Sequence, residues 1–361
     1  MLKFAAIAFL ISFFLSLFII VLSKKYKTLL TDHLHIGPQT FHLSPTPRIG
    51  GLAIFIGVTI SLLSAYFFRE VFKVTFSQNF LFLVLFSLPV FLAGLLEDIS
   101  GKLHPKIRMI FIFFSAALVF KFLDTKILRV DLPFLDELLK IEIISFLFTV
   151  FALTGIANAI NIIDGFNGLA SMVSMMIFMA IAFVAYKLGD YEITTICVIS
   201  SFAILGFFFL NYPFGLIFLG DGGAYFIGFL IGVCSVLLVK KHPEVSAWFA
   251  LMVNLYPVYE TFFSIYRRKI LRKRPAMSPD GLHFHTLIYR IFIKRLLEIQ
   301  SPEIRNPLTS VFLWVLNAFA ILPALLFWDR THILIICCMA FCIFYTYLYW
   351  KIFDIKRIKI E

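Results

Sequence analysis

Long apolar runs separated by short polar stretches dominate the pattern along the chain. A helix needs roughly 20 apolar residues to cross a bilayer, and runs near that length recur between groups of glycine, proline and charged residues. Cutting the chain at those groups gives eleven candidate spans, at residues 4–22, 49–68, 80–96, 107–123, 141–157, 169–186, 193–210, 224–239, 247–266, 308–328 and 332–350. We therefore expect an all-α integral membrane protein, a polytopic bundle of ten or eleven transmembrane helices.

Composition supports this interpretation. The chain is 61% hydrophobic and 15% charged, with a mean hydropathy of +0.96, so it has more apolar surface than one soluble core could use. One polytopic domain over residues 1–361 is the simplest division, with a basic loop at 267–306 inside it. The net charge of +11 fits an anionic membrane leaflet and an anionic substrate, and we expect lipid but no nucleic acid among the partners.

The Lys and Arg residues predict the orientation. With the N-terminus outside, the inner loops and the C-terminal tail hold 21 of the 32 Lys and Arg residues, which satisfies the positive-inside rule. An odd number of spans then places the loops 23–48, 97–106, 158–168, 211–222 and 267–306 on one side. These loops contain nearly all the unusual polar groups, so the sequence predicts one active face, on the cytoplasmic side.

The most polar interruption is the stretch 158–170, NAINIIDGFNGLA. Its polar side chains are Asn158, Asn161, Asp164 and Asn167. The three-residue spacing places them along one face of a helix end. Gly165 and Gly168 permit the positive φ angles and close backbone approach that a turn around a ligand needs. A solvated turn with an ordinary cap on the next helix is the alternative, but it does not explain the shared face.

Two other inner loops carry charged groups where the chain meets the membrane surface. Arg48 follows two prolines in PTPRIGG, where it could bind an anion or could simply anchor the helix in the headgroup region. Glu97 and Asp98 are adjacent at the end of the third run. Two carboxylates there repel each other unless a cation, a metal or a substrate offsets them. An ion-pair cluster with Lys102, Lys106 and Arg108 is the competing account.

The loop after the seventh run contains a further carboxylate between glycines. In NYPFGLIFLGDGG, Asp221 lies at the start of an apolar helix, where it could bind a hard cation such as Mg²⁺ or act as an N-cap. Phe218 could stack on a base or belong to the core. Asn211 begins the same stretch.

The long basic loop ends in a histidine pair. Six Lys and Arg residues within 267–274 precede Asp280, His283 and His285, a grouping that suits phosphates. The basic run alone could be a membrane-surface anchor. Zinc is the other interpretation of the two imidazoles, but no thiolate or third histidine lies nearby in the sequence.

Together, the ordered motifs PTPRIGG, ED, NxxNxxDGxNG, NxPxxxxFxGDxG and PDxxHxH resemble those of the polyprenyl-phosphate N-acetylhexosamine-1-phosphate transferases, integral membrane enzymes. The resemblance covers about residues 37–290. It implies transfer of a sugar-1-phosphate from a UDP-sugar to polyprenyl phosphate, with release of UMP and use of Mg²⁺, or of Mn²⁺. It further implies a multi-pass protein of the inner (plasma) membrane with a cytoplasmic active site. A homodimer is left open.

The resemblance assigns roles position by position. The family's aspartate pair falls on Glu97 and Asp98, which could activate the lipid phosphate or place the metal, and its metal-binding aspartate falls on Asp221. Its substrate-binding positions fall on Arg48, Asn158, Asn161, Asp164, Asn167, Asn211, Phe218, His283 and His285, with Phe218 as the aromatic that stacks on uracil.

The sequence departs from the family pattern at three positions. Glu97 replaces the first aspartate, Asn167 stands where aspartate is common, and Thr286 occupies the usual place of a third histidine. The form SPDGLHFH is more similar to the initiators of O-antigen and teichoic acid synthesis than to the phospho-MurNAc-pentapeptide transferase, which remains an alternative. A noncatalytic protein that binds or transports lipid-linked sugars is a further alternative.

Overall fold

The computed structural model describes residues 1–25, 46–68, 79–271, 273 and 281–358, and within these it contains helices and no β-strand. In chain order the helices are α1 (Leu2–Lys25), α2 (Gly50–Phe67), α3 (Asn79–Ser100), α4 (Pro105–Phe122), α5 (Pro133–Leu139), α6 (Glu142–Ile163), α7 (Leu169–Lys187), α8 (Tyr191–Asn211), α9 (Gly220–Lys241), α10 (Ala247–Val253), α11 (Leu255–Tyr266), η1 (Arg267–Leu271), α12 (Phe284–Leu287), η2 (Ile288–Leu296), α13 (Pro302–Leu326) and α14 (Thr331–Ile358), where η1 and η2 are π-helices. The prediction of an all-α polytopic membrane protein is confirmed.

The predicted spans all fall on helices, and nine helices of the described chain are long and apolar enough to cross a membrane. The two other predicted spans, 107–123 and 247–266, are not among these nine helices, each for its own reason. Helix α4, on the span 107–123, has 18 residues but carries Lys106, Arg108 and Lys121. The span 247–266 is divided at Asn254 into α10 and α11: Pro257, in the first turn of α11, has no N–H to bond the Val253 carbonyl, and the Asn254 side chain donates to the Ala250 carbonyl at 2.8 Å. The short helix α5 was not predicted.

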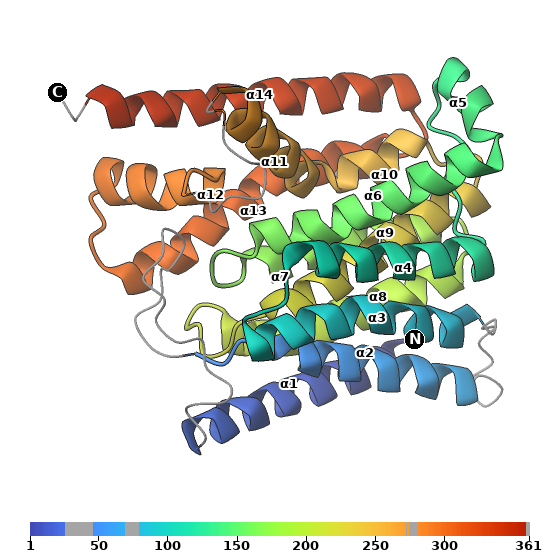
Figure 1. The fold of residues 1–361 in the computed structure, drawn as a ribbon, viewed down its shortest axis with the longest axis horizontal. Coiled ribbons are helices and arrows are strands. Elements are labelled where there is room, and N and C mark those ends of the chain that lie inside the picture. The colour runs from blue at the N-terminus through green and yellow to red at the C-terminus, as the bar shows by residue number, and fades with distance from the viewer. Residues whose placement is uncertain (26–45, 69–78, 272, 274–280, 359–361) are drawn as a thin grey trace.

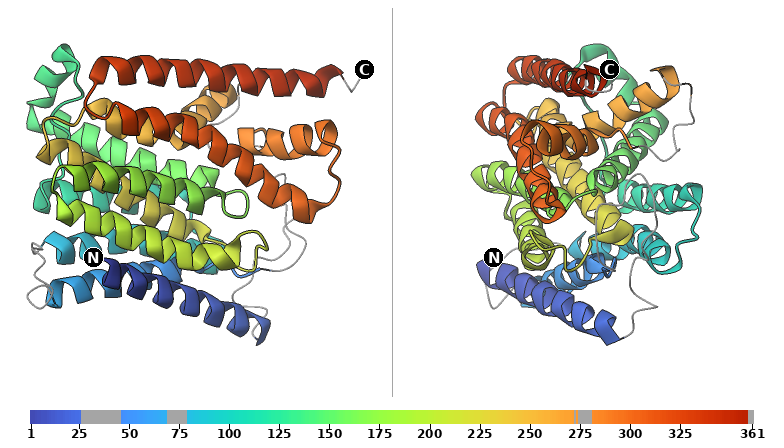
Figure 2. Two further views of the ribbon diagram at one scale, coloured as in Figure 1. Left: turned by 180° about the vertical axis from the view of Figure 1, so that it is seen from behind. Right: turned by 90° about the vertical axis from the view of Figure 1, so that its left-hand side faces the viewer.

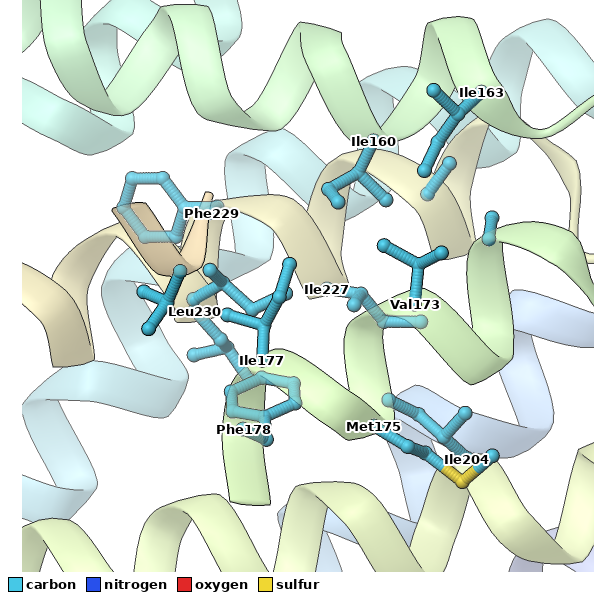
Figure 3. Close-up of a cluster of buried hydrophobic side chains, with 14 of the residues drawn as sticks. Ile160, Ile163, Val173, Met175, Ile177, Phe178, Ile204, Ile227, Phe229 and Leu230 are labelled. Carbon is cyan, nitrogen blue, oxygen red and sulfur yellow. The ribbon is translucent and has the colours of Figure 1, made fainter. Parts of the chain in front are cut away.

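Helix α9 is the centre of the bundle and is buried along nearly its whole length. It packs against α2, α3, α6 and α7, while α1 and α14 lie at opposite edges (Figures 1 and 2). Aliphatic and aromatic side chains from α6, α7, α8 and α9 interlock between these helices, among them Ile160, Val173, Ile204 and Phe229 (Figure 3). This packing holds the start of α9 in a fixed position.

The polar motifs lie at one end of the bundle. Helices α3, α6 and α8 end there, and α2, α4, α7, α9 and α13 begin there (Figure 1). We call this the polar end; it contains Arg48, Asp98, Asp164 and Asp221. The loops that the odd number of spans assigned to one side meet there, as far as they are described; most of the loop 23–48 and Asp280 lie outside the described residues.

Candidate active site

Asp221 is the centre of the polar end, in the first turn of α9. Its Oδ1 atom accepts hydrogen bonds from Arg48 Nη2 and from Asn161 Nδ2, each at 3.0 Å, and its Oδ2 atom contacts Arg108 Nη1. The exposed fraction of the side chain rises from 7% for Asp221 to 15% for Arg108 and 43% for Arg48. The carboxylate is therefore shielded from solvent by two guanidinium groups and one amide that come from three other segments.

Asp98 caps the N-terminus of α9. Its Oδ1 accepts the backbone N–H of Asp221 at 2.8 Å and its Oδ2 accepts the N–H of Gly222 at 2.9 Å. A helix N-terminus leaves unpaired N–H groups and carries partial positive charge, so an anion is stabilised there. The sequence interpretation that Asp221 itself could be the N-cap is wrong: Asp98, from another helix, performs that function.

The side chains of Glu97 and Asp98 bind different parts of the chain. Glu97 Oε2 accepts the backbone N–H of Leu103 at 2.7 Å and so closes the turn between α3 and α4. Asp98 points the other way, toward α9, with Arg48 Nε 3.6 Å from its Oδ1 atom. The structure thus separates the two carboxylates that the sequence presented as a pair, and their roles in catalysis stay a prediction.

The glycine before Asp221 makes this geometry accessible. Gly220 has φ of +75°, in the left-handed region that favours glycine. A Cβ atom there would lie 2.1 Å from the Arg48 carbonyl oxygen and 2.5 Å from Asp98 Oδ2. No other residue could bring the backbone this close to both groups.

The stretch 158–168 contributes from the end of α6. Asn161 donates to Asp221, and Asn158 lies half-buried one turn earlier. Asp164 follows the helix as its C-cap residue. Burial raises the pKa of Asp164 to about 7, with the Arg48 charge lowering it and the Asp221 charge raising it further. Asp164 and Asp221 are therefore close enough to influence each other's charge.

Asn167 and Asn211 fix the loop through backbone contacts. Asn211 Oδ1 accepts the N–H of Gly168 at 2.6 Å, and its Nδ2 donates to the Ile217 carbonyl at 2.7 Å. Asn167 Nδ2 donates to the Pro213 carbonyl at 3.0 Å. Both amides thus join the loop after α6 to the loop after α8, and their predicted contact with substrate stays a prediction.

Phe218 is half-buried in the loop between α8 and α9, two residues before Gly220. Its backbone N–H donates to the Pro47 carbonyl at 2.8 Å, and its carbonyl accepts the N–H of Gly50 at 2.9 Å. These bonds hold the PTPRIGG motif against the start of α9. They explain how Arg48 reaches Asp221, whereas base stacking by the Phe218 ring stays a prediction.

The histidine motif packs beneath the loop at 164–168. The rings of His283 and His285 are parallel, 5.1 Å apart, and an added Cβ atom at Gly165 would lie 3.0 Å from His285 Nε2. His285 also meets the edge of Phe166 at 5.5 Å. Burial, followed by the neighbouring His283, lowers the pKa of His285 to about 3, so this imidazole is neutral at working pH. Thr286, in the third-histidine position, is fully buried.

Sequence reasoning missed three contributors to this end of the molecule. Arg108 was considered as a partner for Glu97 and Asp98, but it binds Asp221. Glu260 is buried in α11 beside His283, and Asn306 on α13 accepts the backbone N–H of Asn167 at 2.9 Å. A signal existed for Glu260, because an acid inside an apolar run is costly unless it has a function. Asn306 lies in polar sequence and gives no such signal.

The donor set around Asp221 suits a hard cation that shares its coordination with substrate. In the described part of the chain, no three His, Cys, Asp or Glu side chains converge on one point. Mg²⁺ keeps several waters and is usually bound by one or two carboxylates together with phosphate oxygens. Asp221, with the charge of Asp164 nearby, fits this pattern. Arg48 and Arg108 would then exchange from the carboxylate to the phosphates.

Comparison with known proteins finds part of this site in a region that is similar to a known family. Residues 80–239 match glycosyl transferase family 4, a range that contains Asp98, Asn161, Asp164 and Asp221. Arg48, Glu260 and the histidine pair lie outside it.

Three relatives cover more of the chain. A probable undecaprenyl-phosphate N-acetylglucosaminyl 1-phosphate transferase from Bacillus subtilis is 31% identical over 241 residues, which cover 66% of this chain and 64% of that protein, just under two thirds of its length. A phospho-N-acetylmuramoyl-pentapeptide-transferase from Staphylococcus carnosus is 29% identical over 78% of this chain and 89% of its own. The protein of that description from Staphylococcus aureus is 28% identical over 70% of this chain and 80% of its own. The helical membrane fold and the order of the motifs agree with this similarity to glycosyl transferase family 4.

Proposed function

We propose that this protein transfers a sugar-1-phosphate, N-acetylhexosamine-1-phosphate in our assignment, from a UDP-sugar to undecaprenyl phosphate. A phosphate oxygen of the lipid attacks the β-phosphorus of the UDP-sugar and forms a new P–O–P link. The bond from the β-phosphorus to the bridging oxygen of UMP breaks, and UMP leaves with that oxygen. The product is a lipid-linked sugar pyrophosphate that would start a cell-envelope polysaccharide.

The observation that carries the proposal is the arrangement around Asp221. The reaction brings two anions together, so catalysis depends on positioning and on neutralising charge. Two guanidinium groups contact the shielded Asp221 carboxylate, which itself lies in the first turn of α9, at the positive end of that helix. These are the groups that phosphoryl transfer between two phosphates requires.

Asp98 supports the reaction by holding α9 in this proposal. Each of its oxygens accepts a backbone N–H group of α9, so in this conformation the carboxylate holds the start of that helix. Glu97 is half-buried, with one described hydrogen bond to its Oε2 atom. We therefore assign positioning to Asp98, and we assign no proton transfer to Glu97, whose Oε2 atom closes the turn between α3 and α4.

Mg²⁺, or Mn²⁺ in its place, would be held by Asp221 and would supply positive charge to the pyrophosphate when bound. Asp164, Asn161 and Phe218 would form the uridine side of the site, because they come from the two loops that Asn211 joins. Arg48, the most exposed cation at this centre, would meet the lipid phosphate at the membrane surface. We place the site on the cytoplasmic side of the inner membrane, where UDP-sugars are found.

A phospho-MurNAc-pentapeptide transferase is the second candidate. The match to the Staphylococcus carnosus protein supports it, because that match covers 89% of the relative. The two candidates differ in the sugar they accept, so substrate choice separates them.

The test is UMP release by the purified protein with undecaprenyl phosphate and Mg²⁺. The substrates are UDP-N-acetylglucosamine, UDP-N-acetylgalactosamine and UDP-MurNAc-pentapeptide. We expect release with a UDP-N-acetylhexosamine and none with the pentapeptide substrate. Asp221→Asn should lower turnover by about 10²-fold or more, the scale for losing a group that stabilises charge in the transition state, while Asp329→Asn at the opposite end serves as the control. Binding of UDP-sugars without UMP release would identify a noncatalytic protein and overturn the proposal.

A further inference from the structure

Glu260 is a buried carboxylate with no role in the chemistry described so far. It lies in the middle of α11 and is 1% exposed. An acidic group in an apolar helix is expensive to bury, and it is retained where it serves a specific partner. Helix α11 packs beside the histidine segment and α14 (Figure 1).

Four donors converge on this carboxylate. Its Oε1 atom lies 2.8 Å from His283 Nδ1, 3.1 Å from Ser264 Oγ and 3.3 Å from the backbone nitrogen of Phe284, and its Oε2 atom accepts the Tyr345 hydroxyl. An ionised carboxylate can only accept, so each of these groups donates its proton to Glu260.

This arrangement determines the tautomer of His283. Because Nδ1 donates to Glu260, the proton of the neutral ring lies on Nδ1, and Nε2 becomes the atom that can meet another group. Within the described residues, Nε2 of His283 has no hydrogen-bond partner. Carboxylates fix catalytic and metal-binding imidazoles in the same way, by orienting the ring and choosing its tautomer.

The orientation of His283 affects the loop at 164–168 through the second imidazole, His285. His283 stacks on His285 with an angle of 10° between the rings, and His285 packs against Gly165 and Phe166. Gly165 directly follows Asp164. The hydrogen bond from His283 to Glu260 fixes the His283 ring, and the stacked His285 ring is thereby held against the loop that carries Asp164.

A second set of contacts anchors the residue before His283. The buried Arg267 guanidinium donates to the Leu282 carbonyl and to the Tyr349 hydroxyl, the latter at 2.8 Å. Helices α11, η1 and α14 therefore all hold the start of the histidine segment, and α14 takes part through Tyr345 and Tyr349.

We propose that Glu260, supported by Tyr345, is a positioning residue that fixes His283 with Nε2 presented, as a hydrogen-bond acceptor, to a protonated phosphate oxygen of the substrate. The inference rests on the proposed function for the identity of that phosphate. Glu260 touches no substrate and acts through His283.

The test is a double-mutant cycle on kcat/KM for UMP release, using parent, Glu260→Gln, His283→Ala and the double variant. Glu260→Gln should lower kcat/KM by about 10- to 100-fold, the range for losing a group that orients a functional histidine. In the His283→Ala background the same change should alter kcat/KM by less than about 2-fold, because coupled residues are not additive. Glu260→Asp, which keeps the charge, should recover part of the loss. Glu142→Gln, at the exposed start of α6, is the matched control and should have no effect.

Two outcomes would overturn the inference. Equal losses in both backgrounds, accompanied by a lower Tm, would mean that Glu260 only stabilises the fold. Full activity in Glu260→Gln would mean that it has no role. If Glu260→Gln does not yield folded protein, Tyr345→Phe runs the same cycle; its smaller loss must disappear in the His283→Ala background or the inference fails.

A separate readout distinguishes this inference from the proposed function. If the parent releases no UMP from any UDP-sugar, the proposed function is wrong, and ¹⁵N NMR of labelled histidine then decides on Glu260. A signal of an Nδ1–H tautomer that is absent from His283→Ala and lost in Glu260→Gln would support the positioning role. The same tautomer in Glu260→Gln would overturn it.

Discussion

At the residue scale, the site is built from acids whose roles differ although their sequence settings look alike. Asp98, Asp164 and Asp221 each lie where an apolar helix begins or ends. Asp98 binds backbone N–H groups, Asp221 binds side-chain cations, and Asp164 is a C-cap residue whose carboxyl is partly desolvated. Their different partners predict different responses to substitution.

Replacing Asp98 by Asn should harm both stability and turnover. An amide offers one oxygen, so its NH₂ group would face the N–H of Asp221 or of Gly222, and one N–H would lose its acceptor. The free energy of unfolding should fall by about 1–3 kcal/mol, as for a buried group left unpaired, and turnover by about 10²-fold because the start of α9 shifts. Glu97→Asp should keep activity. Thermal melts and UMP release check this; an Asp98→Asn protein as stable and active as the parent would contradict it.

Asp164 predicts a pH dependence of stability. Its pKa in the folded protein is about 7, raised mainly by burial, whereas an unfolded Asp ionises near about 4. Between these values the folded state holds a proton that the unfolded chain has released, so this residue's contribution to stability falls as pH rises from about 4 to about 7.

Asp164→Asn removes that titration. Relative to the parent, its Tm should therefore rise between pH 5 and pH 8, which melts at unit pH intervals would reveal. Asp136→Asn on α5 is the control. Parallel Tm curves for parent and Asp164→Asn would contradict the assignment.

Part of the site could be predicted from sequence and part could not, for physical reasons. The three-residue spacing predicted that Asn161 shares a helix face with other polar residues; in the structure it binds Asp221, and its contact with substrate stays a prediction. Adjacent residues on a helix point about 100° apart, so the separation of Glu97 from Asp98 follows from helical geometry. The partners of Asn167 and Asn211 depend on which loops pack together, and a single sequence does not contain that information.

At the element scale, the start of α9 depends on glycines that let three helices approach. A Cβ atom on Gly94 of α3 would lie 2.4 Å from Gly222 Cα, and one on Gly51 of α2 would lie 2.2 Å from the Gly223 nitrogen. Both neighbours are backbone atoms and cannot turn aside. The glycines are visible in the sequence, but the sequence does not show which helix each one contacts.

Gly94→Ala should therefore destabilise the protein by about 1–3 kcal/mol, the range for overpacking a filled interior, and should displace Asp221. Gly155→Ala on α6 is a matched control, because nothing lies within 4 Å of its Cβ position. In a helix interior that change should be neutral or slightly favourable. Thermal melts of both variants in detergent test the idea, and equal Tm values for the two alanine variants would refute it.

The helices themselves were predictable because apolar length and polar breaks decide them. The division at Asn254 was not predicted, although the sequence contains a signal for it: Pro257, three residues later, has no N–H to bond the Val253 carbonyl, and the Asn254 side chain donates to the Ala250 carbonyl. This division determines where Glu260 lies. Helix α11 crosses the direction of its neighbours (Figure 1) and brings Glu260 to the histidine segment.

At the scale of the whole molecule, the bundle has two chemically different ends. The polar end gathers residues that are far apart in the chain, from Arg48 to His285, around the start of α9. The opposite end is closed by contacts that bind the chain to itself; there Arg129 Nη2 donates to the Val245 carbonyl at 2.6 Å and Asp131 accepts the N–H of Ala247 at 2.7 Å. The residues that we propose for substrate binding thus lie at one end of the bundle.

The last prediction assigns that end of the bundle to the cytoplasmic side. The loops and tail assigned to the polar end carry 21 of the 32 Lys and Arg residues, and such residues are retained on the inner side of the membrane. With the five native cysteines replaced by alanine, single cysteines would be introduced as Lys102→Cys at the polar end and Lys140→Cys at the opposite end, both exposed positions. A membrane-impermeant maleimide should label Lys140→Cys in intact cells and Lys102→Cys only after the membrane is opened. Labelling of Lys102→Cys in intact cells would reverse the orientation and leave the site without access to cytoplasmic UDP-sugars.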